Sequence, residues 1–216
     1  MARRFQFWIT GLVQLVALAA WAQAGHQSSL DIYVYNKAGV SSGILSHAEQ
    51  DATRIFRISG LHAMWVECST AEITRTDCNG LPQPGDVVLQ IVHETRELKD
   101  DVFGAAFLGR DGTGQYTNVF YDRVNELHRD WNVSLADMLG HVMAHEVGHL
   151  LLGLNAHSIS GIMRSHWDSA ELKAAERGRL LFSAEQSRIM RERLATATSR
   201  RDTRNALAFE FGSPGN

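Results

Sequence analysis

Several features that mark other classes of protein are scarce or absent in this sequence of 216 residues. Basic residues are not in excess, since 21 Lys and Arg stand against 24 Asp and Glu, so no surface for nucleic acid is indicated. No internal repeat indicates a solenoid. The only two cysteines form no Cys-x-x-Cys pair, which argues against a structural zinc site. With 44% hydrophobic and 21% charged residues, the composition fits one globular domain and neither a disordered chain nor a multi-span membrane protein.

The first 24 residues have the order of a secretory signal peptide. Arg3 and Arg4 are followed by an apolar run and then by Ala22–Ala24, the small-x-small pattern that precedes signal cleavage. An uncleaved membrane anchor is the alternative, but three polar residues interrupt the run and it is short for a span. We therefore expect cleavage after residue 24 and a secreted or periplasmic protein. Contact with a membrane is expected only through the signal segment, if it stays uncleaved.

The two cysteines are expected to pair. Export would carry Cys68 and Cys78 to a compartment in which disulfides persist. The bond would then close the loop between a predicted strand and the turn-rich segment CNGLPQPGD. Two free thiols are the alternative.

The hydrophobic pattern predicts strands and helices in alternation. Period-two patterns and β-branched runs predict five strands, at residues 29–36, 61–68, 86–94, 103–108 and 117–121. Apolar residues at helical spacing, with capping residues at Ser46, Ser134 and Ser183, predict four helices, at residues 46–60, 134–153, 168–180 and 183–195. The chain is charged and aperiodic from about residue 196. We therefore expect one catalytic domain over residues 25–195 and a disordered tail over residues 196–216.

The stretch MAHEVGHLLLGLNAHSISGIM (143–163) concentrates the residues that can carry chemistry. His145 and His149 are four residues apart on a predicted helix, so both imidazoles can face one metal ion. Glu146 is rotated about 100° from His145, beside the metal, where it can take a proton from a zinc-activated water. His141, one turn earlier, is expected to lie in the core or to support a ligand, because a fourth ligand would leave no place for water. A structural helix that carries this pattern by chance is the alternative.

This stretch resembles the signature of the metzincin metallopeptidases, in which HExxHxxGxxH is followed by a methionine turn. The resemblance implies a role for each matching residue: general base for Glu146, a helix-ending turn at Gly153, a Met-turn at Met163, and zinc ligation by His145, His149 and His157.

The resemblance also implies a fold and a place for the substrate. The fold is α+β, with a twisted mixed sheet of about five strands, a backing helix, an active-site helix and a helical C-terminal subdomain. The segment GAAFLG, with the later NVFYD, is similar to the edge strand and its neighbour in the matrixin branch of the family. An extended substrate would pair with that edge strand, which contains Gly104, Ala105, Ala106 and Phe107.

The spacing around Gly153 departs from the family pattern. Metzincins place two residues in each gap beside the glycine, whereas this chain has three in each, Leu150–Leu152 and Leu154–Ala156. One extra helical residue turns the point of exit by about 100°. His157 is the predicted third ligand, with His166 and Glu171 as alternatives, because a catalytic zinc ion takes three protein ligands and an open position.

The sequence therefore predicts an exported zinc-dependent endopeptidase with one Zn²⁺ ion. Its partner would be a peptide or protein substrate and not a nucleic acid, and we expect a monomer. The alternative is an exported zinc-binding or protein-binding module that keeps the fold without catalysis, because the lengthened gaps could distort the site.

Overall fold

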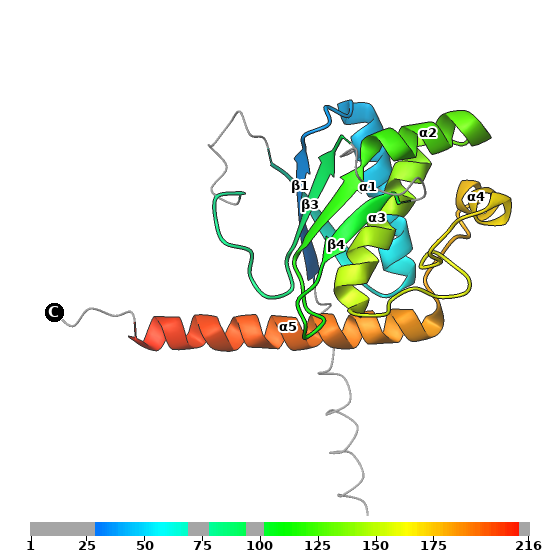
Figure 1. Ribbon diagram of the computed structural model, residues 1–216. Coiled ribbons are helices and arrows are strands. Elements are labelled where there is room, and N and C mark those ends of the chain that lie inside the picture. Colours follow the sequence, from blue (N-terminus) through cyan, green and yellow to red (C-terminus); the bar gives the residue numbers. More distant parts are fainter. Residues whose placement is uncertain (1–28, 69–77, 94–101, 212–216) are drawn as a thin grey trace, which may run out of the picture.

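The computed structural model describes residues 29–68, 78–93 and 102–211, and Figure 1 shows their arrangement. Five strands form one sheet in the order β2-β1-β3-β5-β4. Neighbouring strands are parallel except β4, which runs antiparallel to β5 at the edge of the sheet. The predicted mixed sheet of about five strands is thus confirmed. The strands are β1 (Ser29–Asn36), β2 (His62–Glu67), β3 (Val87–Val92), β4 (Gly104–Phe107) and β5 (Tyr116–Phe120).

Helices α1 and α3 pack against each other and against the sheet, and together they form the core. Alternate residues of β1, namely Leu30, Ile32 and Val34, are buried, as expected for a strand with one covered face. Helix α3 is apolar on nearly all sides, which is typical of a helix enclosed by the rest of the fold. The helices are α1 (Ser42–Ile58), α2 (Tyr121–Trp131), α3 (Leu135–Leu152), α4 (Ser169–Glu176) and α5 (Ala184–Phe211).

Helices α1 and α2 differ from the prediction. Helix α1 begins at Ser42, with Ser41 as its N-cap, so Ser46 lies inside the helix and does not cap it. Helix α2 was not predicted at all. It follows β5 without an intervening turn, and only Val124 and Leu127 are buried on it, so its apolar period is too short to stand out from the sequence.

The prediction of a disordered tail is wrong for residues 196–211, because α5 continues to Phe211. In Figure 1 this long helix crosses one end of the sheet, and its C-terminal half extends beyond the sheet. Arg201 attaches it to the body, since its Nε donates to the carbonyl oxygen of Pro84 and its guanidinium lies 2.9 Å from Asp86. The part of α5 after residue 195 is held by polar contacts and has little apolar periodicity, so its sequence gives no helical signal.

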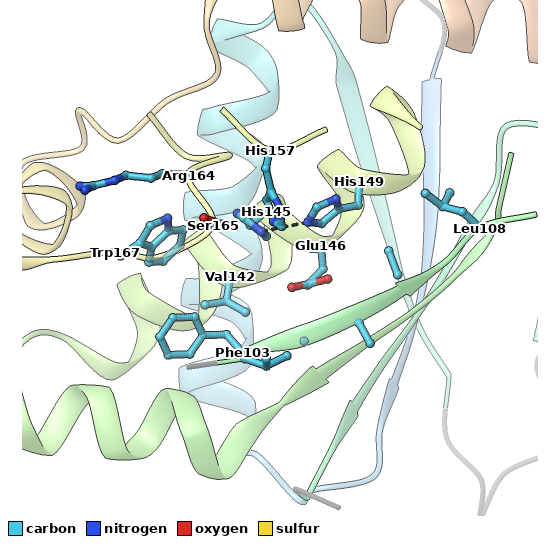
Figure 2. Close-up of a pocket in the computed structure, with 14 residues that line it drawn as sticks. Phe103, Leu108, Val142, His145, Glu146, His149, His157, Arg164, Ser165 and Trp167 are labelled. Carbon is cyan, nitrogen blue, oxygen red and sulfur yellow. Dashed lines mark hydrogen bonds between the residues drawn. The ribbon is translucent and has the colours of Figure 1, made fainter. Parts of the chain in front are cut away.

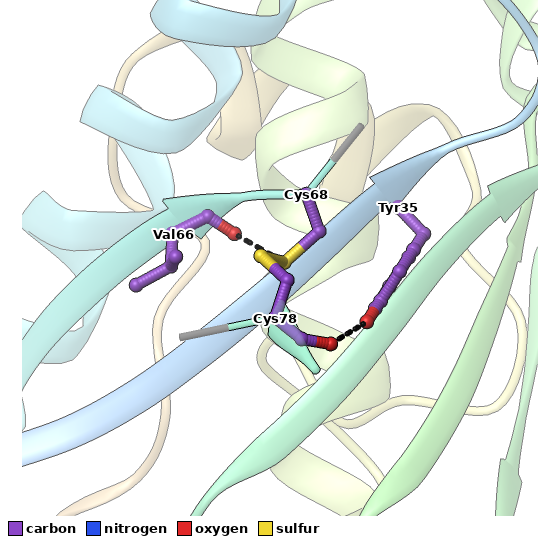
Figure 3. The surroundings of a disulfide bond; sticks show 4 residues. All are labelled: Tyr35, Val66, Cys68 and Cys78. Atoms are coloured by element: carbon purple, nitrogen blue, oxygen red, sulfur yellow. Dashed lines mark hydrogen bonds between the residues drawn. A yellow bond between two sulfur atoms is a disulfide. The ribbon is translucent and has the colours of Figure 1, made fainter. Parts of the chain in front are cut away.

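The disulfide between Cys68 and Cys78 is confirmed. It joins the end of β2 to the segment that precedes β3, and the hydroxyl of Tyr35 on β1 donates a hydrogen bond to the carbonyl oxygen of Cys78 (Figure 3). The predicted signal peptide lies outside the described residues. Among the helices that the structure describes, none combines the length and the hydropathy needed to cross a membrane.

Candidate metal centre

Helix α3 carries the first three candidate residues and is fixed at both ends. Its N-cap, Ser134, accepts a hydrogen bond from the backbone N–H of Asp137 through its side chain, as predicted. At the other end Gly153 donates its N–H to the carbonyl oxygen of His149 and has a φ of 82°, a backbone conformation that glycine adopts without strain. The helix therefore ends one turn after His149, and the chain can turn back toward it.

The structure brings three histidines together (Figure 2). The Nε2 atoms of His145 and His149 are 3.1 Å apart, and the ligand atoms of these two residues and of His157 all lie within 4.8 Å of one another. Two nitrogen ligands at about 2.05 Å from a tetrahedral Zn²⁺ ion would be about 3.3 Å apart. The separation of His145 and His149 matches this value, and His157 lies close enough to complete a set of three donors. Zinc is the cofactor that this donor set supports.

The protonation of His145 and His149 suits metal binding. His145 Nδ1 lies 2.6 Å from the carbonyl oxygen of Ile162, so this nitrogen carries the proton and Nε2 keeps its lone pair. Burial lowers the pKa of His145 to about 4 and the pKa of His149 to about 3. Both imidazoles are therefore neutral near pH 7, as a metal ligand must be.

His157 reaches the site through the lengthened loop after Gly153. Asn155 has a φ of 59°, in the left-handed region that asparagine tolerates better than most residues. After this turn the N–H of Ser158 donates to the carbonyl oxygen of Met163. The ring of His157 then lies with its centroid 4.7 Å from that of His149. The left-handed turn at Asn155 and the hydrogen bond between Ser158 and Met163 thus accommodate the extra residue in each gap beside Gly153.

The two alternative third ligands lie elsewhere. His166 is exposed and does not belong to the histidine cluster. The carboxylate of Glu171 accepts a hydrogen bond from the N–H of Asp168 at the start of α4 and forms an ion pair with Arg164. Both partners contact its Oε2 atom, and Glu171 does not belong to the histidine cluster.

Glu146 lies between α3 and the edge strand β4 and is 4% exposed (Figure 2). Burial raises the pKa of its carboxyl to about 8. A cation held by the adjacent histidines would act in the opposite direction, since positive charge favours the ionised form of a carboxyl. Glu146 lines a cleft of about 210 Å³ together with the three histidines and Gly104, Ala105 and Ala106 of β4.

Two other predicted residues, Met163 and Phe107, lie outside the lining of this cleft. Met163 is fully buried beside α3, where a Cβ atom placed on Gly148 would be 2.8 Å from its sulfur. Phe107, the last residue of β4, is 54% exposed and lines a separate groove instead of the cleft.

The sequence analysis missed two residues that shape the site. Trp167 packs edge-on against His145, and its Nε1 donates to the same Ile162 carbonyl oxygen that binds His145. Phe103 also packs against Trp167, with ring centroids 5.9 Å apart. Neither contact has a fixed sequence spacing, although an aromatic residue soon after the predicted methionine turn was a possible signal.

Comparison with known proteins finds similar solved structures. No protein-family model and no curated protein sequence matches the chain. A zinc-dependent peptidase from Methanocorpusculum labreanum (strain Z) is 16% identical over 74% of this chain and 99% of its own, with a TM-score of 0.51. An archaemetzincin from Methanopyrus kandleri is 17% identical over 80% and 99%, with a TM-score of 0.49. The first of these similarities shows that the chain has the fold of a zinc-dependent peptidase.

Proposed function

We propose that this chain is an exported zinc-dependent endopeptidase of metzincin type. The observation that carries the proposal is the meeting of three imidazole donors with the carboxyl group of Glu146 in one cleft beside an edge strand. Three protein ligands leave one position open on a tetrahedral Zn²⁺ ion, as catalytic zinc sites do. His145, His149 and His157 would hold the ion.

In this mechanism Glu146 is the general base. Its position next to His145 on α3 places it to take a proton from the attacking water and to return the proton to the leaving amine. A Zn²⁺ ion held by the three histidines would supply Lewis acidity toward the scissile carbonyl and lower the pKa of water. The side chain of Ile162 takes no part, but its carbonyl oxygen fixes the ring of His145 and leaves Nε2 available.

The edge strand β4 is the proposed place for the substrate backbone. In the described part of the chain β4 pairs only with β5, so its other edge is available to an extended peptide. The cleft beyond Gly104 is walled by Val142, Phe103 and Trp167, an apolar surface that suits an uncharged side chain of the substrate.

Export and the matrixin-like details are part of the proposal. The N-terminal pattern supports passage across a membrane, and a disulfide bond is stable in the compartments that export reaches. Met163, buried against α3 next to the histidines, fits the methionine of a Met-turn. We propose a monomer with peptide or protein substrates.

The proposal is tested by metal analysis combined with peptide cleavage. The purified wild-type chain should contain one zinc ion, cleave a mixed library of peptides, lose cleavage when a chelator removes the metal, and recover it with added Zn²⁺. Glu146→Gln should keep the zinc and lose about 10²–10⁴-fold in turnover, because the general base is gone.

Two outcomes would contradict the proposal. Stoichiometric zinc without cleavage of any library member would favour the non-catalytic binding module. Full proteolysis by the Glu146→Gln variant would show that Glu146 is not the base.

A further inference from the structure

A second hollow, larger than the catalytic cleft, lies between α5 and the end of the sheet. Figure 1 shows where α5 crosses that end. This groove has a volume of about 680 Å³. It is lined by Phe107 at the end of β4, Tyr116 at the start of β5, and Arg193, Arg200 and Arg204 on α5. The side chains of these residues take no part in the proposed mechanism.

The three arginines present positive charge to the groove. They are seven and four residues apart, so they lie on one face of α5. Arg193 donates to the carbonyl oxygen of Gly112, which leaves its charge without a carboxylate in direct contact. Among the described residues, Arg200 and Arg204 form no ion pair.

The acidic residues of the groove have other partners. Asp86 pairs with Arg201, and Glu192 pairs with Arg188 one turn earlier on α5. Asp111 accepts hydrogen bonds from the backbone N–H and the hydroxyl of Thr113, and the charge of Arg193 also acts on it. The guanidinium groups of Arg200 and Arg204 are therefore unmatched in a chain whose net charge is negative.

Two aromatic side chains form the other part of the groove. Phe107 and Tyr116 are directly paired in the register of β4 and β5, so their side chains lie side by side on one face of the sheet. They are 54% and 45% exposed. A ligand that combines carboxylates with an apolar or aromatic group would match both parts of the groove.

Strand β4 connects this groove to the catalytic cleft. Gly104 lies against Glu146, and Phe107, about 10 Å further along the strand, lies in the groove. A peptide that pairs antiparallel with β4, the somewhat more stable arrangement, runs from Phe107 toward Gly104. The part of such a peptide that precedes the scissile bond would therefore pass over the groove.

We propose that this groove binds an acidic segment of the substrate on the N-terminal side of the scissile bond. The proposal rests on the endopeptidase function described above. The attachment of Arg201 to Asp31 and Asp86 holds α5 in place, so Arg200 and Arg204 are positioned before the substrate arrives.

The test compares peptides that share one cleavable core. One peptide carries glutamates about four to seven positions before the scissile bond, the second carries glutamines there, and the third carries the glutamates after the scissile bond. Zinc-loaded wild-type enzyme should cleave the first peptide with a kcat/KM about 3–10-fold above that of the other two, mainly through KM. The preference should disappear at about 0.5 M salt, because the arginines are exposed to solvent.

A double variant and a matched control assign the effect to the groove. Arg200→Gln with Arg204→Gln should abolish the preference and leave cleavage of the glutamine peptide within about twofold of wild type. Arg57→Gln with Arg129→Gln removes the same charge from exposed positions outside both hollows and should keep the preference.

The contrary outcomes are distinct. If wild-type enzyme cleaves all three peptides equally, or if the double variant keeps the preference, the groove proposal is wrong and the proposed function stands. If zinc-loaded wild-type enzyme cleaves none of the three peptides, the proposed endopeptidase function is wrong, and the groove proposal, which rests on it, is wrong as well. Binding to anionic lipid vesicles that the double variant loses, with peptide preference unchanged, would assign the arginines to a membrane surface and overturn the proposal.

Discussion

His141 and His145 lie one turn apart on α3, and their surroundings differ completely. His141 is fully buried, and its Nδ1 lies 2.8 Å from the carbonyl oxygen of Asp137 and 2.8 Å from a carboxylate oxygen of Asp51 on α1. His145 has a neutral carbonyl, that of Ile162, as the partner of its Nδ1, and its Nε2 faces a second imidazole.

The difference shows that the partner of a histidine decides its role more than its helical spacing does. Residues 141, 145 and 149 are all related by i,i+4 spacing, so spacing alone allows either neighbour of His145 to join a metal site. Of these three, His145 and His149 belong to the cluster that can hold an ion, together with His157, and His141 does not. His141 is committed to the contact between α1 and α3, as expected for a core histidine.

The strongest test of this contrast is removal of His157. If His157 supplies the third imidazole, His157→Ala should weaken zinc affinity by at least about 100-fold and reduce turnover accordingly, because a lost ligand should cost no less than a lost supporting contact. Competition with a chromophoric chelator measures the affinity, and cleavage of a fluorogenic peptide measures the turnover.

His166→Ala is the matched control, since His166 is exposed and lies outside the cluster. It should leave zinc affinity unchanged. Unchanged zinc affinity in His157→Ala would mean that another residue, such as His141, supplies the third ligand, and the contrast between His141 and His145 would then be wrong.

The sequence predicts those residues of the site that lie together on one helix, α3. The positions of His145, Glu146 and His149 follow from helical geometry, and the ends of α3 follow from Ser134 and Gly153. The return of His157 depends on the left-handed conformation of Asn155, which no spacing rule specifies. The Ile162 carbonyl, Trp167 and Phe103 reach the site through tertiary packing, and so no local pattern identifies them.

The same distinction applies to the fold. The five strands have clear β-branched or alternating patterns and were predicted close to their observed bounds. Helix α2 and the second half of α5 were missed because they bury few apolar side chains. Their positions depend on neighbours distant in the sequence, such as the contacts of Arg201 with Asp31 and Asp86.

A smaller effect on turnover is expected from Gly104. A Cβ atom at this position would lie 2.5 Å from the carboxyl carbon of Glu146 and 2.5 Å from the carbonyl oxygen of Asn118, closer than real contacts allow. Gly104→Ala should displace the carboxylate or the edge strand and lower kcat about 10–100-fold while zinc content stays at one ion. Peptide turnover and metal analysis measure the two quantities.

Gly43→Ala on α1 is the matched control, because a Cβ atom there would contact nothing within 4 Å. It should have wild-type turnover. An unchanged kcat in Gly104→Ala would show that Glu146 can move without loss, and its close contact with β4 would then have no catalytic importance.

The smallest effect on turnover should come from Asp51, the partner of His141. Asp51→Asn should change kcat/KM by less than about twofold, because Asp51 is not part of the cleft. It should lower the free energy of unfolding by about 1–3 kcal/mol, because it removes the charge that faces His141 and Arg54. Denaturant unfolding followed by circular dichroism measures the stability.

The pH dependence of that stability loss separates the ion pair from simple repacking. Burial acts to raise the pKa of Asp51, but hydrogen bonds and charges from His141 and Arg54 outweigh burial and hold the pKa below its ordinary value of 3.8. Asp51 therefore stabilises the folded chain above about pH 4, and this contribution is lost as the pH falls through the lowered pKa. The stability difference between wild type and Asp51→Asn should shrink below pH 4. A stability difference that stays constant below pH 4 would mean that the contact stabilises through packing and not through charge. A large loss of zinc in Asp51→Asn would connect His141 to the metal site.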